Sequence, residues 1–216
     1  MIINIDNVSK TIKKIPIITD VSLTLKPGVI TGLKGINGSG KTMIMRLVSG
    51  LIRPTEGKIM FGDKELWKDI SFPESIGVLI ENPAFIDYFS GFENLRMLAD
   101  IKNKITSEDI RKTIETVGLD PDDKKKYKLY SLGMKQRLGI ACAIMEHPDV
   151  IVLDEPTNAL DTDGIEMVKK VLVQEKERGA IILLSCHDYG ILKELSDEIY
   201  FIENGMITGY EGKSAE

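Results

Sequence analysis

The segment GINGSGKT, residues 35–42, has the spacing G-x-x-x-x-G-K-[ST] of a loop that binds phosphate groups. Its glycines let successive backbone N–H groups turn toward an anion, and the helix expected next directs its positive end to the same place. Lys41 is expected to bridge β- and γ-phosphate oxygens, and Thr42 to offer a hydroxyl group to Mg²⁺. The alternative is a glycine-rich turn with a chance lysine. The predicted phosphate-binding residues are Gly35, Ile36, Asn37, Gly38, Ser39, Gly40, Lys41 and Thr42.

Two adjacent carboxylates, Asp154 and Glu155, follow the apolar run VIVL. A buried carboxylate is costly unless a cation, a proton or hydrogen bonds compensate its charge. Asp154 is therefore the expected Mg²⁺ ligand. Glu155 points in a different direction and is the candidate general base that orients or deprotonates an attacking water. The alternative for Glu155 is a carboxylate that only opens the turn formed by Pro156 to Asn158.

Short β-branched runs alternate with helical patterns, which predicts an α/β fold around a mostly parallel sheet. The expected strands are residues 29–34, 76–80, 150–154 and 180–185. His187 follows the last of them, so we expect it at the same sheet edge as Asp154. A histidine after a buried strand can also be a structural hydrogen-bonding group, and the other histidine, His147, is assigned no chemistry.

Two other regions have different patterns. Apolar and polar residues alternate within residues 1–27 and 57–62, which predicts an N-terminal antiparallel β-subdomain. Apolar residues at helical spacing predict a mostly helical insert at about residues 86–146. These elements are expected to form a single domain, residues 1–216.

The composition suits a globular domain with a substantial core, since 43% of the 216 residues are hydrophobic and 28% are charged. The net charge is −5 and no segment is strongly basic, so the charge distribution does not favour binding of nucleic acid. A nucleic-acid partner is therefore not expected. Cys142 and Cys186 are expected to be buried free thiols. No stretch approaches the roughly 20 apolar residues that cross a bilayer, so the chain by itself is expected to be soluble.

Five ordered motifs make the chain resemble the ATP-binding subunits of ABC transporters over essentially its whole length. They are GINGSGKT, YSLGMKQR at 130–137, VIVLDEP, NALD at 158–161 and LLSCHD. The resemblance implies the fold of a P-loop NTPase and an ATPase that uses ATP and Mg²⁺. It also implies catalytic roles for Lys41, Glu155 and His187, and the last of these is expected to contact the γ-phosphate.

The resemblance further implies a head-to-tail dimer, in which each ATP lies between the phosphate loop of one subunit and the YSLGMKQR signature of the other. Ser131 and Gly133 lie at the N-terminus of a predicted helix. There a hydroxyl group and backbone amides are available to bind an anion, which suits that second site. An ordinary helix cap is the alternative for Ser131. Asp161 is expected to contribute to nucleotide binding from the NALD loop. The implied partners are a membrane-spanning permease and a second ATPase subunit, as a homodimer or heterodimer, at the cytoplasmic face of the cell membrane.

Three departures from the family pattern bear on function. Glu81 stands where a glutamine is usual, and this additional carboxylate is expected to approach Mg²⁺ or the water. Such a glutamate, with SLGMKQR, resembles exporters of bacitracin-like and lantibiotic peptides. Ile12 takes the place of the usual aromatic residue under adenine, which predicts weak discrimination among purine nucleotides. Leu132 and Met134 replace a glycine and a glutamine of the signature, which leaves the ribose contact open.

Two other functions compete with transport. A soluble ATPase switch of the same family, such as an iron–sulfur assembly component, would use the same motifs without a membrane partner. A small-molecule kinase would need an acceptor pocket and leaves the signature unexplained.

Overall fold

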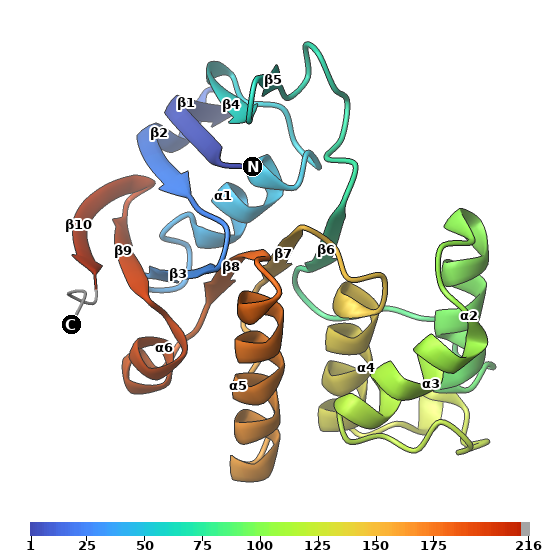
Figure 1. The fold of residues 1–216 in the computed structure, drawn as a ribbon. Coiled ribbons are helices and arrows are strands. Elements are labelled where there is room, and N and C mark those ends of the chain that lie inside the picture. The colour runs from blue at the N-terminus through green and yellow to red at the C-terminus, as the bar shows by residue number, and fades with distance from the viewer. Residues whose placement is uncertain (213–216) are drawn as a thin grey trace.

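A six-stranded, mostly parallel sheet forms the centre of the computed structural model, which describes residues 1–212 (Figure 1). The strands lie in the order β10-β9-β3-β8-β7-β6, and only β10 runs antiparallel to its neighbour. The predicted α/β fold is confirmed, and the expected strands differ from the observed ones by at most one residue at an end. The bounds are β3 (Val29–Lys34), β6 (Ile76–Leu79), β7 (Val150–Leu153), β8 (Ile181–Ser185), β9 (Glu198–Glu203) and β10 (Met206–Gly212).

The carboxyl ends of the central strands align at one edge of this sheet. Leu33 of β3 faces Ser185 of β8, and Leu153 of β7 faces Leu184 of β8. Every residue of β7 and β8 is buried, as expected of parallel strands that are covered on both faces. Residues that directly follow these strands therefore leave the core together, and this edge holds the candidate site.

A second sheet, in the order β2-β1-β4-β5, is entirely antiparallel, which confirms the predicted antiparallel pattern. Alternate residues of β1, including Ile3 and Ile5, are buried and pack in one core cluster with Leu47 and Val48 of α1. The sheet therefore covers the helix that follows the phosphate loop. The bounds are β1 (Ile3–Ile12), β2 (Ile15–Leu25), β4 (Glu56–Phe61), β5 (Lys64–Glu65) and α1 (Lys41–Val48).

Three helices form a lobe beside the central sheet, with α2 and α3 on its outer side (Figure 1). Ser90 and Glu93 form a capping box at the start of α2, and Thr106 and Asp109 form one at the start of α3. The helices are α2 (Gly91–Lys102), α3 (Ser107–Thr116) and α4 (Leu132–Ile144), with a 3₁₀ turn at Tyr127–Leu129. The helices α5 (Thr162–Glu177) and α6 (Tyr189–Leu195) contribute to the same core cluster as α4.

The aromatic side chains of residues 85–92 divide between core and surface. Phe85 and Phe92 pack against the main core, whereas Tyr88 is 70% exposed. Cys186 is buried and Cys142 is partly buried, and both are free thiols. Within residues 1–212, no helix has the length and apolar character needed to cross a membrane.

Candidate active site

The phosphate loop connects β3 to α1 through backbone conformations that require glycine. Gly40, the residue that caps α1, has a φ of 115°, which side chains rarely tolerate. A Cβ atom on Gly35 would lie within 2.4 Å of Ser39 Oγ and of the Ile202 carbonyl oxygen. These constraints explain why the sequence predicted the loop so strongly.

Lys41 is the buried cation of this loop, with only 5% of the residue exposed. Its Nζ donates hydrogen bonds to the carbonyl oxygens of Gly35 (2.8 Å) and Ile36 (3.1 Å). Desolvation lowers the pKa of Lys41. The negative charges of Glu155 and Asp154 oppose this effect, whereas the like charge of Lys34 adds to it. An anionic ligand would compensate the partly desolvated ammonium group.

The hydroxyl group of Ser39 is a second feature of the loop that fits an anionic ligand. Among the residues that the structure describes, its Oγ is buried and has no hydrogen-bond partner. Buried hydroxyl groups are nearly always satisfied, so an unpaired one inside a phosphate loop fits a bound oxyanion. The loop also lines a cavity of ≈ 290 Å³ together with Glu155.

Asp154 and Thr42 lie together, as the metal-binding prediction requires. Thr42 Oγ1 donates to Asp154 Oδ2 at 2.6 Å, and Ser185 Oγ donates to Asp154 Oδ1 at 2.6 Å. Ser185 therefore holds the carboxylate oxygen that Thr42 does not contact. The sequence did not predict this role, although a polar residue at the end of the apolar strand β8 was an available signal. Mg²⁺ prefers one or two protein oxygen ligands together with substrate phosphates, so this pair fits the ion. Within residues 1–212, no cluster of three or more His, Cys, Asp or Glu side chains forms a closed metal site.

Glu155 and His187 form a close pair at the same sheet edge. His187 Nε2 lies 2.7 Å from Glu155 Oε2, and Asn158 Nδ2 donates to the same oxygen at 2.6 Å. The Glu155 side chain is 19% exposed, so water can reach a carboxylate that is otherwise held in place. This geometry suits a base that orients a water molecule.

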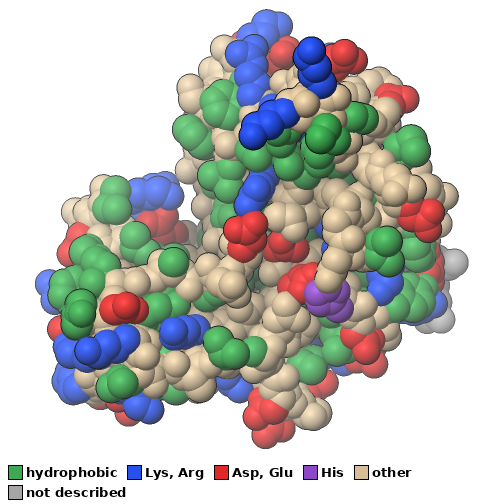
Figure 2. Space-filling view, turned by 180° about the vertical axis from the view of Figure 1, so that it is seen from behind, with side chains coloured by type: hydrophobic (Ala, Val, Ile, Leu, Met, Phe, Trp, Pro, Cys, Tyr) green, Lys and Arg blue, Asp and Glu red, His purple; other side chains and the backbone are tan. Residues whose placement is uncertain are grey.

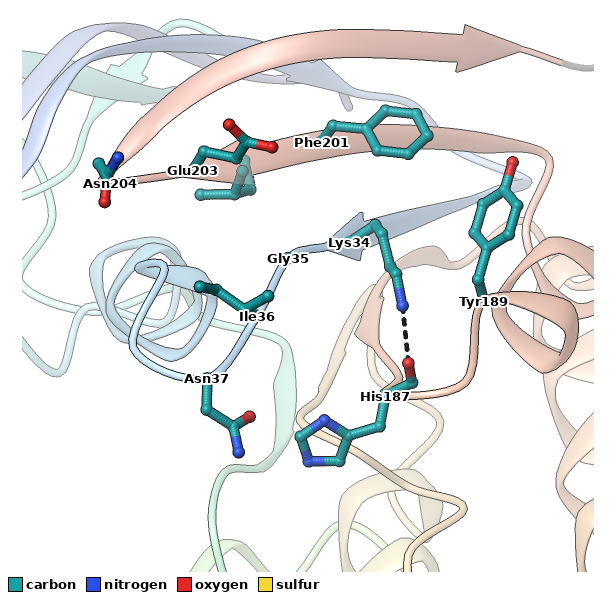
Figure 3. A pocket seen from close by; sticks show the side chains of 10 residues that line it. Lys34, Gly35, Ile36, Asn37, His187, Tyr189, Phe201, Glu203 and Asn204 are labelled. Atoms are coloured by element: carbon teal, nitrogen blue, oxygen red, sulfur yellow. Dashed lines mark hydrogen bonds between the residues drawn. The ribbon is translucent and has the colours of Figure 1, made fainter.

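A larger hollow of ≈ 740 Å³ adjoins the phosphate loop (Figure 3). Lys34 points across it and donates a hydrogen bond from Nζ to the His187 carbonyl oxygen at 2.7 Å. This bond joins the end of β3 to the segment after β8 and so positions His187. Lys34 had no role in the sequence prediction, because residues 153 positions apart give no local signal.

Glu81 lies two residues after β6, has a φ of 62° and forms an ion pair with Arg46. Arg46 and Thr42 are four residues apart, so they share one face of α1. That face therefore presents a hydroxyl group to Asp154 and a guanidinium group to Glu81. Arg46 was missed from the sequence, although its spacing from Thr42 was an available signal.

The other predicted nucleotide contacts lie apart from the loop cavity, whose lining includes none of them. Ser131 caps α4 by accepting a hydrogen bond from the Met134 N–H at 3.2 Å, and Gly133 follows in the first turn. Asp161 caps α5 and its side chain is 77% exposed. Ile12 ends β1 and is 38% exposed. Their roles in nucleotide binding stay predictions.

The fold and the loop define a P-loop nucleotide-binding domain, and the comparisons with known proteins identify its family. Residues 18–158 match the family model described as ABC transporter. The chain is 45% identical, over 95% of its length and 94% of the relative, to "Uncharacterized ABC transporter ATP-binding protein YybJ" of Bacillus subtilis. It is 35% identical, over 95% of its length and 88% of the relative, to "Lantibiotic transport ATP-binding protein SrtF" of Streptococcus pyogenes.

Solved structures agree on the fold. "Dimeric Structure of MJ0796, a Bacterial ABC Transporter Cassette" superposes with a TM-score of 0.89 at 22% identity, covering 99% of this chain and 100% of that one. The chain belongs to the ABC transporter family, as one of its ATP-binding proteins, and is an ATPase.

Proposed function

We propose that this chain is the ATPase subunit of a transporter and that it drives a separate membrane-spanning partner by ATP-dependent dimerisation. The observation that carries the proposal is the Glu155–His187 pair at 2.7 Å, beside the buried Lys41 and the Thr42–Asp154 pair. A nucleotide-binding module without hydrolysis would not need a held carboxylate at that position. A kinase would need an acceptor pocket in place of the water.

The residues of the site divide the chemistry of hydrolysis among them. Loop amides and Lys41 bind the β- and γ-phosphates, and they stabilise the charge that develops during transfer. Mg²⁺, held by Thr42 and Asp154, supplies electrostatic stabilisation of the phosphate oxygens when it is bound. Glu155 accepts the proton of the attacking water, and His187 contacts the γ-phosphate and holds the carboxylate.

Dimerisation completes the site in this proposal. Ser131 and Gly133 open α4 away from the loop cavity of their own chain, and Leu132 between them is 74% exposed. An exposed helix N-terminus binds anions, so these residues suit the γ-phosphate on a second ATPase subunit. ATP thereby stabilises the dimer and hydrolysis releases it.

The partner is a permease that holds the chain at the cytoplasmic face of the membrane. The surface of this chain that docks the permease comprises Glu81 and the segment that follows it. In that segment the apolar or aromatic side chains of Ile86, Tyr88 and Phe89 are exposed. Lysine and arginine side chains gather on the neighbouring lobe formed by α2 to α4 (Figure 2). Lantibiotic-like peptides are the proposed cargo, in line with the relative SrtF and the glutamate at position 81.

Affinity purification of the Glu155→Gln chain from detergent extracts with ATP and Mg²⁺ tests this function. We expect a polytopic membrane protein to copurify and to stimulate ATP turnover when it is produced with the unsubstituted chain. A mock purification without the tagged chain is the control. Recovery of soluble proteins alone, with no membrane partner, would support the soluble switch instead.

The ion pair between Arg46 and Glu81 leads to a further prediction. Arg46→Gln leaves the Glu81 carboxylate uncompensated near the phosphates, so ATP turnover of the assembled transporter should fall about two- to fivefold, the range expected of a partly exposed pair. Adding Glu81→Gln to that variant should recover most of the loss, because it removes the charge. Turnover measured at low salt checks this, and losses that simply multiply in the double variant would show that the two residues act independently.

A further inference from the structure

The second turn of α4 reaches the main chain of the catalytic base. Gln136 is only 7% exposed, and its Nε2 donates a hydrogen bond to the Glu155 carbonyl oxygen at 3.0 Å. The same carbonyl accepts a bond from the Asn158 N–H at 3.1 Å, which closes the turn after β7. Gln136 therefore ties the helical lobe to the turn that carries the base.

That turn has a backbone conformation that its surroundings must hold. Glu155 has a φ of 53°, which is left-handed and costly for a residue with a side chain. Two side chains from other elements hold it, because the Glu155 N–H donates to Ser185 Oγ at 3.1 Å and its carbonyl accepts from Gln136. Loss of either bond would let the peptide planes rotate and redirect the carboxylate.

The same helix also begins at the surface assigned to the second subunit. Gly133 lies one turn before Gln136, about 4.5 Å along the helix axis. Within one turn a helix moves as a rigid body, so contact of Ser131 and Gly133 with a nucleotide would displace Gln136 as well. Arg137 anchors the same turn to the lobe by donating from Nη1 to the Val117 carbonyl oxygen at 2.8 Å.

We propose that Gln136 is a positioning residue that couples the two ATP sites of the dimer. When Ser131 and Gly133 engage the nucleotide on the partner, Gln136 sets the Glu155 backbone in its own subunit and brings the carboxylate to its working position. The inference rests on the proposed function, because the coupling requires the dimer. It assigns to Gln136 a function beyond filling buried space.

The first test is Gln136→Met, which keeps the length of the side chain and removes its donor. We expect kcat for ATP to fall about tenfold, with KM within about twofold, because the nucleotide contacts are unchanged. The Hill coefficient for ATP should also fall toward one. Gln174→Met is the matched control, since Gln174 is an exposed glutamine on α5, and it should match the unsubstituted chain in every respect.

The second test uses Gln136→Glu, whose introduced carboxyl group donates a hydrogen bond only when it is protonated. Its turnover relative to the unsubstituted chain should rise as the pH falls from about 8 to about 6, since burial raises the pKa of a carboxyl group. The same ratio for Gln136→Met should stay flat. A packing role alone predicts near-normal turnover for Gln136→Met.

Two outcomes would overturn the inference, and they have different causes. If Glu155→Gln forms an ATP-dependent dimer but Gln136→Met keeps its kcat and Hill coefficient, the positioning role is wrong while the proposed function stands. If Glu155→Gln forms no dimer with ATP in size-exclusion chromatography, the proposed dimer mechanism fails and the coupling fails with it. Thermal unfolding of both Gln136 variants shows whether they are folded. Recovery of ATP turnover by Gln136→Glu at low pH tests the positioning role with a side chain of nearly the same volume as glutamine.

Discussion

Replacing Glu155 with glutamine should lower ATP turnover by about 10²–10⁴-fold and leave ATP binding nearly unchanged. The amide matches the carboxylate in shape, and its oxygen can still accept the hydrogen bond from Asn158 Nδ2. It cannot take a proton from water, so the step assigned to Glu155 is lost. The phosphate loop and the Thr42–Asp154 pair are untouched, so nucleotide affinity should stay within about twofold. Phosphate release and a fluorescent nucleotide titration measure the two quantities.

Slow hydrolysis should also make the dimer visible. With ATP and Mg²⁺ the Glu155→Gln chain should elute at twice the monomer mass of 24.1 kDa, whereas the unsubstituted chain should return to monomer as ATP is consumed. Glu177→Gln, on the exposed last turn of α5, is the matched control and should hydrolyse ATP normally. A loss of turnover below about tenfold in Glu155→Gln would show that Glu155 is not the base.

The part of this site that the sequence predicted is the part fixed by local geometry. The phosphate loop needs glycine at fixed positions, as the φ of 115° at Gly40 shows, and the strand and helix on either side have clear periodicity. Asp154 and His187 could be placed at one edge because carboxyl ends of parallel strands share an edge. Strand ends were uncertain by one residue because hydrogen bonding, and not composition, decides them.

The contacts that the sequence did not predict are tertiary contacts between distant polar side chains. Ser185 binds Asp154 across 31 positions, and Gln136 binds the Glu155 carbonyl across 19. Arg46 compensates the charge of Glu81, which lies 35 positions away in the sequence, so this unusual carboxylate is one partner of an ion pair. Periodicity gives no information about such partners, since any polar residue on the right face could serve. They nevertheless hold the acidic side chains whose types suggested the chemistry.

Removing the charge of Lys41 should abolish most nucleotide binding. Lys41→Met keeps the unbranched stem but loses the ammonium group, so ATP affinity should weaken about 10- to 200-fold, the range for hydrogen bonds to charged groups. The effect should be larger for ATP than for AMP, because AMP lacks the β- and γ-phosphates that Lys41 binds. Isothermal titration provides both affinities. Lys64→Met, in the exposed strand β5, is the control and should bind ATP normally.

The pH dependence of binding separates the charge of Lys41 from its bulk. Desolvation lowers the pKa of this ammonium group in the free protein, so it loses its proton at a lower pH than an ordinary lysine. ATP affinity should therefore fall as the pH rises into the alkaline range. Bound phosphates favour the ammonium form, so binding there should take up protons, which appears as a heat that depends on the ionisation enthalpy of the buffer. Lys41→Met should show neither effect, and an unchanged pH profile in that variant would mean that another group carries the dependence.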